Sequence, residues 1–225
     1  MKPVSKPVKY LGLFVLLLGP IITFYLISRG EHRFIDLDYF GPREAIVQSD
    51  GSVDTLYHSI PSFRLVNQFG DTVTEAIMDG KIVVADFFFS TCPTICPAMS
   101  RNMSELQLQL DEPHFHMVKL VSHTVNPVYD TPSVLLAYGE KHDADFDRWT
   151  FLTGDKEQIY RLGVEGYMLP AQEDALAPGG FLHSEMFVLI DTKGHIRGYY
   201  DGTQLIEMRR LINDIKILIK QLKEA

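Results

Sequence analysis

An apolar run that leads straight into two cysteines constrains the fold of this chain more than any other feature. Residues 81–89, KIVVADFFF, are almost all apolar and rich in β-branched and aromatic side chains, a pattern typical of a strand buried on both faces. The next eight residues, STCPTICP, hold both cysteines of the chain, Cys92 and Cys96. Pro97 suits the first position of a helix. The sequence therefore predicts a strand, a loop and a helix, with the cysteines between strand and helix.

The rest of the chain alternates between strand and helix patterns. Strands are expected at 63–74 and 187–200, each as an antiparallel hairpin, and at 116–121. Helices are expected at 130–142, at 156–163 and from about residue 203 to the C-terminus. This order, with a strand running into the cysteine loop, predicts a thioredoxin-like α/β fold in which flanking helices cover a central mixed β-sheet.

Several other residues invite a functional interpretation, and most have a structural alternative. Met99 and Met103 carry soft sulfur, but their helical spacing favours core packing. Asp86 interrupts the apolar run, where a buried carboxyl could pass a proton to a thiol or could be a hydrogen-bonded structural residue. His123 is a candidate to support a metal ligand near the carboxyl edge of the sheet. His195, in a tight turn, is expected to be solvated.

A 19-residue uncharged stretch lies near the N-terminus, from Tyr10 to Ser28. As a helix it would span roughly 28 Å, close to the thickness of a bilayer core. Three lysines precede it, so the positive-inside rule orients the N-terminus to the cytoplasm and the body across the membrane. An uncleaved anchor is the favoured interpretation, with a cleaved signal peptide as the alternative.

These patterns divide the chain into four parts. Residues 1–9 are expected to form a cytoplasmic N-terminus, 10–29 a transmembrane anchor, 30–59 a tether and 60–225 the thioredoxin-like domain. The expected location is a bacterial inner membrane, crossed once, with the C-terminal domain on the periplasmic side. Because that compartment is oxidising, two cysteines can form a disulfide there.

Charge and cysteine count exclude several classes of protein. The chain has 21 basic and 29 acidic residues, a net charge of −8. Since residues 1–30 contain four basic residues and no acid, the remainder carries −12. Such a body is a poor nucleic-acid binder, because neutralising phosphates needs concentrated Lys and Arg. Two cysteines cannot build a disulfide-rich scaffold, nor a zinc or iron–sulfur site made of cysteine alone.

The position of the two cysteines suits reactive sulfur chemistry. A helix N-terminus favours the thiolate, which attacks disulfides and binds metals. Thioredoxin-type redox motifs have two residues between the cysteines, whereas this chain has three, and residues four apart can face the same side of a helical turn. Two soft sulfurs brought together suit copper, with a third ligand completing the site. A static disulfide, a redox pair and a metal site all remain open at this point.

Four segments resemble the Sco/SenC family of copper-binding proteins, in the order expected for that family. They are FFFSTCPTICP, TVNPVYDTP, WTFLTG and LHSEMFVLID, and the similarity runs over most of residues 60–222. The resemblance implies a thioredoxin-like fold and a role in cytochrome c oxidase assembly. A protein of this kind delivers copper to the dinuclear CuA site of subunit II, or reduces the cysteines of that site.

The resemblance also implies a ligand set of Cys92, Cys96 and His183. The segment before the histidine, from Gly166 to Phe181, is rich in Gly, Pro and Ala and is expected to be mobile. A ligand at the end of such a segment would let a site close on copper and open to release it.

Two departures from the family pattern lie outside the ligand set. Leu182 stands directly before the histidine, where the family often has Asp. Asn126 and Tyr129 stand where the family has an acid and a base. These changes bear on partner recognition and on the electrostatics around the metal.

Two functions are therefore expected. The first is a membrane-anchored metallochaperone that holds Cu(I) or Cu(II), with subunit II, a copper donor protein and the membrane as implied partners. The second is an enzyme-like thiol–disulfide reductase, which leaves open whether the chain is an enzyme. The functions separate at His183, because copper ligation requires it whereas disulfide exchange needs only the two thiols and access. Zinc is a further candidate metal, but soft sulfur favours copper.

Overall fold

The structure, a computed structural model, describes residue 14 and residues 16–20, 36–48, 51–174 and 181–224; for residues 182, 183 and 224 it describes the backbone alone. Contacts separate residues 1–35 from a compact domain of residues 36–225. Most of the expected anchor, 10–29, lies outside the described residues, as does the start of the expected tether. Within the part of the chain that is described, no helix is both long enough and apolar enough to cross a membrane.

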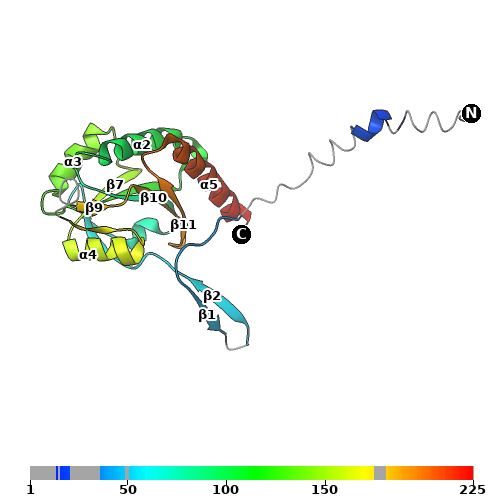
Figure 1. The fold of residues 1–225 in the computed structure, drawn as a ribbon, viewed down its shortest axis with the longest axis horizontal. Helices are drawn as coiled ribbons and strands as arrows, with labels where there is room; N and C mark the ends of the chain where they lie inside the picture. Colours follow the sequence, from blue (N-terminus) through cyan, green and yellow to red (C-terminus); the bar gives the residue numbers. More distant parts are fainter. Residues whose placement is uncertain (1–13, 15, 21–35, 49–50, 175–180, 225) are drawn as a thin grey trace, which may run out of the picture. The chain divides into compact units, whose positions relative to one another are not determined.

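A seven-stranded mixed sheet forms the centre of the domain (Figure 1). Its order is β11 (Ile196–Asp201), β10 (Met186–Ile190), β5 (Ile82–Phe88), β6 (Val118–Thr124), β7 (Trp149–Thr153), β3 (Arg64–Asn67) and β4 (Thr72–Thr74). Strands β5, β6 and β7 are parallel, and the two hairpins flank them with antiparallel pairs. The predicted mixed sheet is confirmed, with the apolar run as an interior strand.

Helices cover both faces of this sheet (Figure 1). One face carries α2 (Cys96–Gln109), α3 (Pro132–Lys141) and α5 (Leu205–Glu224). The other face carries α4 (Lys156–Arg161), which continues into a π-helix, η3 (Leu162–Gly166). Two short 3-10 helices, η1 (Glu75–Met78) and η2 (Pro113–Phe115), occur in the connections. The thioredoxin-like α/β arrangement expected from the sequence is therefore present.

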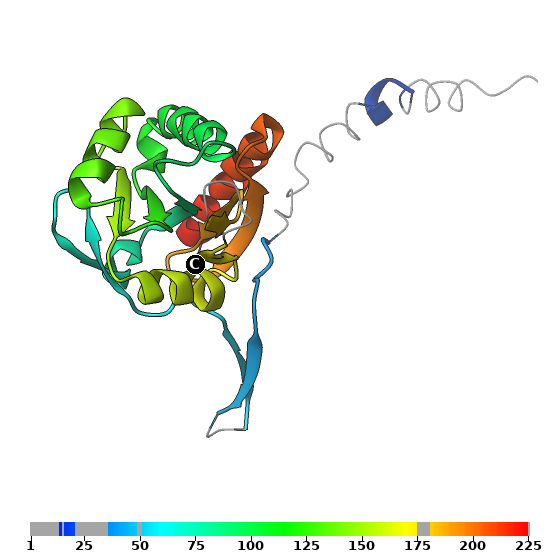
Figure 2. The same cartoon turned by 60° about the vertical axis from the view of Figure 1, so that its left-hand side comes forward.

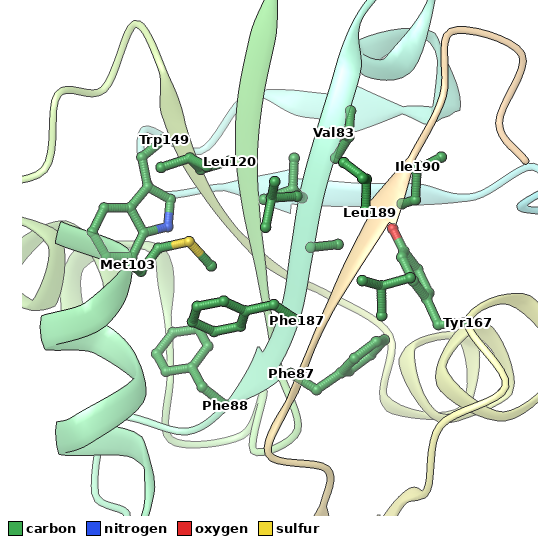
Figure 3. Close-up of a cluster of buried hydrophobic side chains, with 14 of the residues drawn as sticks. Val83, Phe87, Phe88, Met103, Leu120, Trp149, Tyr167, Phe187, Leu189 and Ile190 are labelled. Atoms are coloured by element: carbon green, nitrogen blue, oxygen red, sulfur yellow. The ribbon is translucent and has the colours of Figure 1, made fainter. Parts of the chain in front are cut away.

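The hydrophobic core lies on both sides of β5 (Figure 3). Phe87 and Tyr167 lie on one side of the strand, whereas Phe88, Met103 and Trp149 lie on the side of α2. All seven residues of β5 are buried. Burial on both faces explains why this run shows no alternation of polar and apolar residues.

Two strand pairs and one single strand depart from the predicted elements. The hairpin of β1 (Arg43–Val47) and β2 (Val53–Tyr57) lies in the stretch expected to be a tether, and it extends away from the body of the domain (Figure 2). The pair β8 (Ala171–Glu173) and β9 (Phe181–His183) lies in the segment expected to be mobile. Strand β7 is missing from the predicted elements. All five strands have three to five residues, too few for a periodic signal.

The expectation that His195 is solvated is wrong. Its ring lies edge-on to Tyr39 and Tyr57, with ring centroids 5.5 and 5.9 Å away. Its Nδ1 lies 3.0 Å from the carbonyl oxygen of His58. The turn between β10 and β11 therefore packs against the segment that precedes residue 60, and this contact half-buries the histidine.

Candidate metal centre

The cysteine loop begins where β5 ends, as the sequence predicts. Cys92 is 8% exposed and Cys96, the first residue of α2, is 1% exposed. No disulfide joins the two sulfurs in this structure, and the side chain of Cys92 is hydrogen-bonded to that of Cys96. Cys92 donates its backbone N–H to the carbonyl of Phe89 at 3.1 Å, and its Sγ lies 3.6 Å from the hydroxyl of Thr94. The loop thus holds two sulfurs in contact, just beneath the surface.

The Cys96 thiol holds its proton more strongly than an ordinary cysteine does. The hydrogen bond with Cys92, together with burial, raises the pKa of the Cys96 thiol far above its ordinary value. For Cys96 the hydrogen bond with Cys92 and burial therefore act against the helix N-terminus, which by itself favours the thiolate. Cys92, the more exposed of the two, is the sulfur that an external reactant meets first.

A buried carboxylate fastens the cysteine loop to a neighbouring loop. Asp130 is 0% exposed and accepts hydrogen bonds from the hydroxyls of Ser90 and Thr124. It also accepts the backbone N–H of Ser90 at 3.1 Å. The sequence pattern places Asp130 only at the start of a helix. Nothing local could have revealed its role, since its partner Ser90 is 40 residues away.

The backbone of the predicted third ligand, His183, reaches the same edge of the sheet. Its residue pairs with Ala171 in the β8–β9 ladder, and β10 begins three residues later, at Met186. Strand β10 runs antiparallel to β5, so the chain enters it at the end of β5 that carries the cysteine loop. The ring of Phe181 lies 5.1 Å from that of Phe89. The topology therefore brings the backbone of all three predicted ligands to one edge.

The side chain of His183 lies outside the described residues. Among the residues whose side chains are described, no three or more His, Cys, Asp or Glu residues are grouped to hold a metal ion. Two soft sulfurs are the donors that are present, and soft sulfur suits copper. The ligand set of Cys92, Cys96 and His183 thus stays a prediction, of which the structure describes two side chains.

The other candidate residues fall outside the metal site. Met99 and Met103 are fully buried in the core, as predicted. His123 is also fully buried, with its ring stacked on Phe87 at 4.9 Å and its Nε2 3.0 Å from the hydroxyl of Tyr167. Burial lowers the pKa of His123 to about 3, so the imidazole is neutral. It supports the core on the α4 side of the sheet rather than a metal ligand.

Asp86 lies near enough to the thiols for its charge to act on Cys96. It is 2% exposed, and its charge contributes, after the hydrogen bond and burial, to the raised pKa of Cys96. The expectation of a buried acid near the cysteines is confirmed. Its role in proton transfer remains a prediction.

Fold and site together define a class of protein. This is a thioredoxin-like domain with two cysteine thiols where an interior strand meets a helix. The SCO1/SenC family model matches residues 54–220, about three quarters of the chain, so the chain belongs to the SCO1/SenC family. The resemblance found in the four sequence segments is confirmed.

Three relatives illustrate the similarity. The SCO1 protein homolog of Bacillus subtilis is 29% identical over 168 residues, covering 72% of this chain and 84% of that protein. The structure of BsSco, a member of the Sco family of cytochrome c oxidase assembly proteins in which a disulfide switch has been identified, is 27% identical with a TM-score of 0.64. That match covers 72% of this chain and 94% of that one.

A third relative carries the metal. The structure of Bradyrhizobium japonicum ScoI with copper bound has a TM-score of 0.60 and 22% identity, and the match covers 72% of this chain and 99% of that chain. At this identity the likeness shows the shared fold. Copper is thus found in a protein with the same architecture.

Proposed function

We propose that the protein is a copper metallochaperone that acts in assembly of the CuA site of cytochrome c oxidase. The observation that carries the proposal is the pair of adjacent, mutually hydrogen-bonded thiols of Cys92 and Cys96 at the end of β5. Family membership and the copper-bound ScoI support it. Copper is the cargo, held as Cu(I) or Cu(II) by the two sulfurs and the imidazole of His183.

The chemistry of the pair suits temporary binding. Two sulfurs in contact present soft donors that need no large rearrangement to share one ion. The low exposure of both thiols limits access of water and oxidants to the metal. Cys92 is near enough to the surface for an incoming ligand to reach the ion, which is what transfer to another protein requires.

A thiol–disulfide reductase is the second candidate, and the difference in exposure between the two thiols favours it, 8% for Cys92 and 1% for Cys96. The thiolate of Cys92 would attack one sulfur of a partner disulfide, forming a mixed disulfide and releasing the other partner sulfur as a thiolate, which takes up a proton. Cys96, after losing its proton, would then attack the sulfur of Cys92. That step forms the Cys92–Cys96 disulfide and releases the second partner thiol, so the partner gains two electrons and two protons.

The proposed setting follows from the N-terminal stretch. An anchor at residues 10–29 would hold the domain on the periplasmic side of a bacterial inner membrane. The proposed partners are subunit II of cytochrome c oxidase as acceptor and a copper donor protein. The same location would suit the reductase, since the CuA cysteines of subunit II must be reduced before they bind copper.

Copper titration of the full chain in detergent tests the proposal. Reduced wild type should bind one copper tightly against a competing chelator, whereas Cys92→Ser, Cys96→Ser and His183→Ala should each lose at least about tenfold in affinity. His114→Ala is the matched control, because this exposed histidine contacts only Glu112 among the described ion pairs. If reduced wild type does not bind copper tightly, the proposed metallochaperone function is wrong.

His183 separates the two candidate functions. His183→Ala should lose tight copper binding and keep most of its rate of dithiol exchange with a small disulfide. If copper binding and exchange fall together in this variant, the division of roles between the imidazole and the thiols is wrong. Cys92→Ser should abolish exchange in either case.

A further inference from the structure

Two of the segments that border the thiols contain no charged side chain. The cysteine loop, residues 90–98, and the turn that follows β6, residues 124–129, lack Asp, Glu, Lys and Arg altogether. They are neighbours, because Asp130 binds Ser90 and the N–H of Val125 donates to the carbonyl of Phe88 at 2.8 Å. In a chain with 22% charged residues, this neutral rim is distinct from the rest of the domain.

The rim exposes two large apolar side chains. Val128 is 81% exposed, the highest value among the exposed large hydrophobic residues of the described chain, and Tyr129 is 54% exposed. Both lie in the segment where the family pattern has charged residues. Exposed apolar side chains that adjoin a reactive site mark a contact surface more often than an isolated exposed residue does.

These side chains are held on a rigid support. The N–H groups of Tyr129 and Asp130 both donate to the carbonyl of Asn126, at 3.1 and 2.9 Å. The hydroxyl of Tyr160 donates to the carbonyl of Val125 at 2.8 Å. A surface that is already fixed loses little conformational freedom when a partner binds, which favours its use as an anchor.

A metal or disulfide acceptor has to approach over this rim. Direct transfer brings an acceptor atom within bonding distance of Cys92 or of its ion, and Cys92 is only 8% exposed. The acceptor therefore presses its own surface against the loops around the thiol. Over these two loops a charged surface would lose hydration without finding an opposite charge, so the part of the acceptor that faces them is apolar and neutral.

We propose that Val128 and Tyr129 form the seat for the protein that accepts copper or electrons from this site, and that the accepting surface is an apolar, uncharged rim around its own metal-binding cysteines. This inference rests on the proposed function and extends it to the partner. It predicts that docking is driven by apolar contact rather than by the net charge of −12 on the body.

The docking step can be measured apart from transfer. The full chain in detergent, metal-free, is titrated with the soluble apo CuA domain of subunit II from the same organism, and affinity is read by interferometry. Val128→Asp/Tyr129→Asp should weaken docking at least about tenfold, in line with the loss of two anchors. Copper affinity of the variant should be unchanged, which shows that the site is intact.

Two controls make the result specific. Leu108→Asp places the same charge at a residue of α2 that is 73% exposed and outside the rim, and it should dock as wild type does. The wild-type docking affinity should change less than about threefold between roughly 20 and 500 mM salt, since apolar contacts are not screened. Four results would each contradict the proposed seat. In the first two, the double variant docks as tightly as wild type, or Leu108→Asp loses as much docking affinity as the double variant does. In the other two, wild type does not dock at all, or its docking affinity falls steeply with salt.

Failure of the seat and failure of the proposed function give different results. If docking depends on Val128 and Tyr129 while neither copper nor electrons pass to the CuA domain, the seat stands and the proposed function falls. If wild type and the double variant deliver copper at equal rates and dock equally, the function stands and the seat falls. The rate is followed by the absorption of the assembled CuA site.

Discussion

The two ends of strand β5 are built from different chemistry. The amino-terminal end faces the turn between β10 and β11, where Arg197 and Asp191 form an ion pair at 3.0 Å with both side chains buried. Arg197 also donates to the carbonyls of Leu37 and Asp38, at 2.6 and 3.1 Å. Its guanidinium lies 4.0 Å from the centre of the Tyr39 ring. This end is a charged clamp that ties the start of the domain to the sheet.

Two surface segments at the carboxyl-terminal end are neutral. The cysteine loop and the 124–129 turn carry no charged residue, and the acid that joins them, Asp130, is buried and hydrogen-bonded. Strong ion pairing is thus found at the end of β5 where the chain must stay fixed. Over the two neutral segments an acceptor can approach without breaking ion pairs.

The largest expected effect comes from breaking the clamp. Arg197→Met leaves the carboxylate of Asp191 buried without its cation, and we expect the free energy of unfolding to fall by about 3–5 kcal/mol. Copper affinity per folded molecule should not change, because the clamp is at the far end of β5. Chemical denaturation and copper titration measure the two quantities.

Lys156→Met is the control for the clamp. It removes the exposed ion pair with Glu173, which should cost less than about 1 kcal/mol. If Arg197→Met loses copper affinity as well as stability, the two ends of β5 are coupled and do not act independently.

Acid should weaken the core near the neutral end through His123. Burial lowers its pKa to about 3 in the folded chain, whereas an unfolded histidine titrates near 6.5. Below pH 6.5 the unfolded chain therefore binds a proton that the folded chain does not, so the stability is full above pH 6.5 and falls toward pH 3. This one group should remove about 3 kcal/mol between pH 6.5 and 4.

Denaturation at a series of pH values measures this loss. His123→Gln should flatten the acid limb, because glutamine does not titrate. An acid limb of the same steepness in His123→Gln would mean that other groups control the acid response.

A smaller effect is expected from loosening the support of the cysteine loop. Asp130→Asn replaces one carboxylate oxygen, an acceptor, by an NH2 group, which is a donor. The side chain can then no longer accept all the hydrogen bonds from Ser90 and Thr124, and we expect a loss of about 2 kcal/mol in unfolding free energy. Copper affinity should fall about tenfold, because the position of Ser90 sets the start of the loop. The exposed Asp111→Asn should change neither quantity. Wild-type copper affinity in Asp130→Asn would show that the loop keeps its shape without this carboxylate.

The smallest effect is expected at the rim. Val128→Ser should change the unfolding free energy by less than about 0.5 kcal/mol, since the side chain is 81% exposed. The same change at the buried Val121, 1% exposed, should cost about 2–3 kcal/mol. Thermal denaturation compares the two. A large loss in Val128→Ser would mean that this side chain supports the fold rather than a partner.

Most of the sheet and its long helices could be predicted because their signals are local. Strand β5 is a continuous apolar run, and the stripe of Met99, Met103 and Leu106 fixed both the existence and the buried face of α2. Strand β7 escaped prediction because five residues give no clear period and its stability comes from β6 and β3 on either side. The same reason applies to the short hairpins at 43–57 and 171–183.

The sequence by itself determined the strand, loop and helix that present Cys92 and Cys96, since hydrophobic period and proline placement act over a few residues. Only the tertiary structure decided that a hydrogen bond and burial raise the pKa of Cys96, that Asp130 fastens the loop, and that His195 is packed rather than solvated. Each of these depends on burial or on a partner tens of residues away. Such contacts are set by strand register and packing, which a local pattern does not encode.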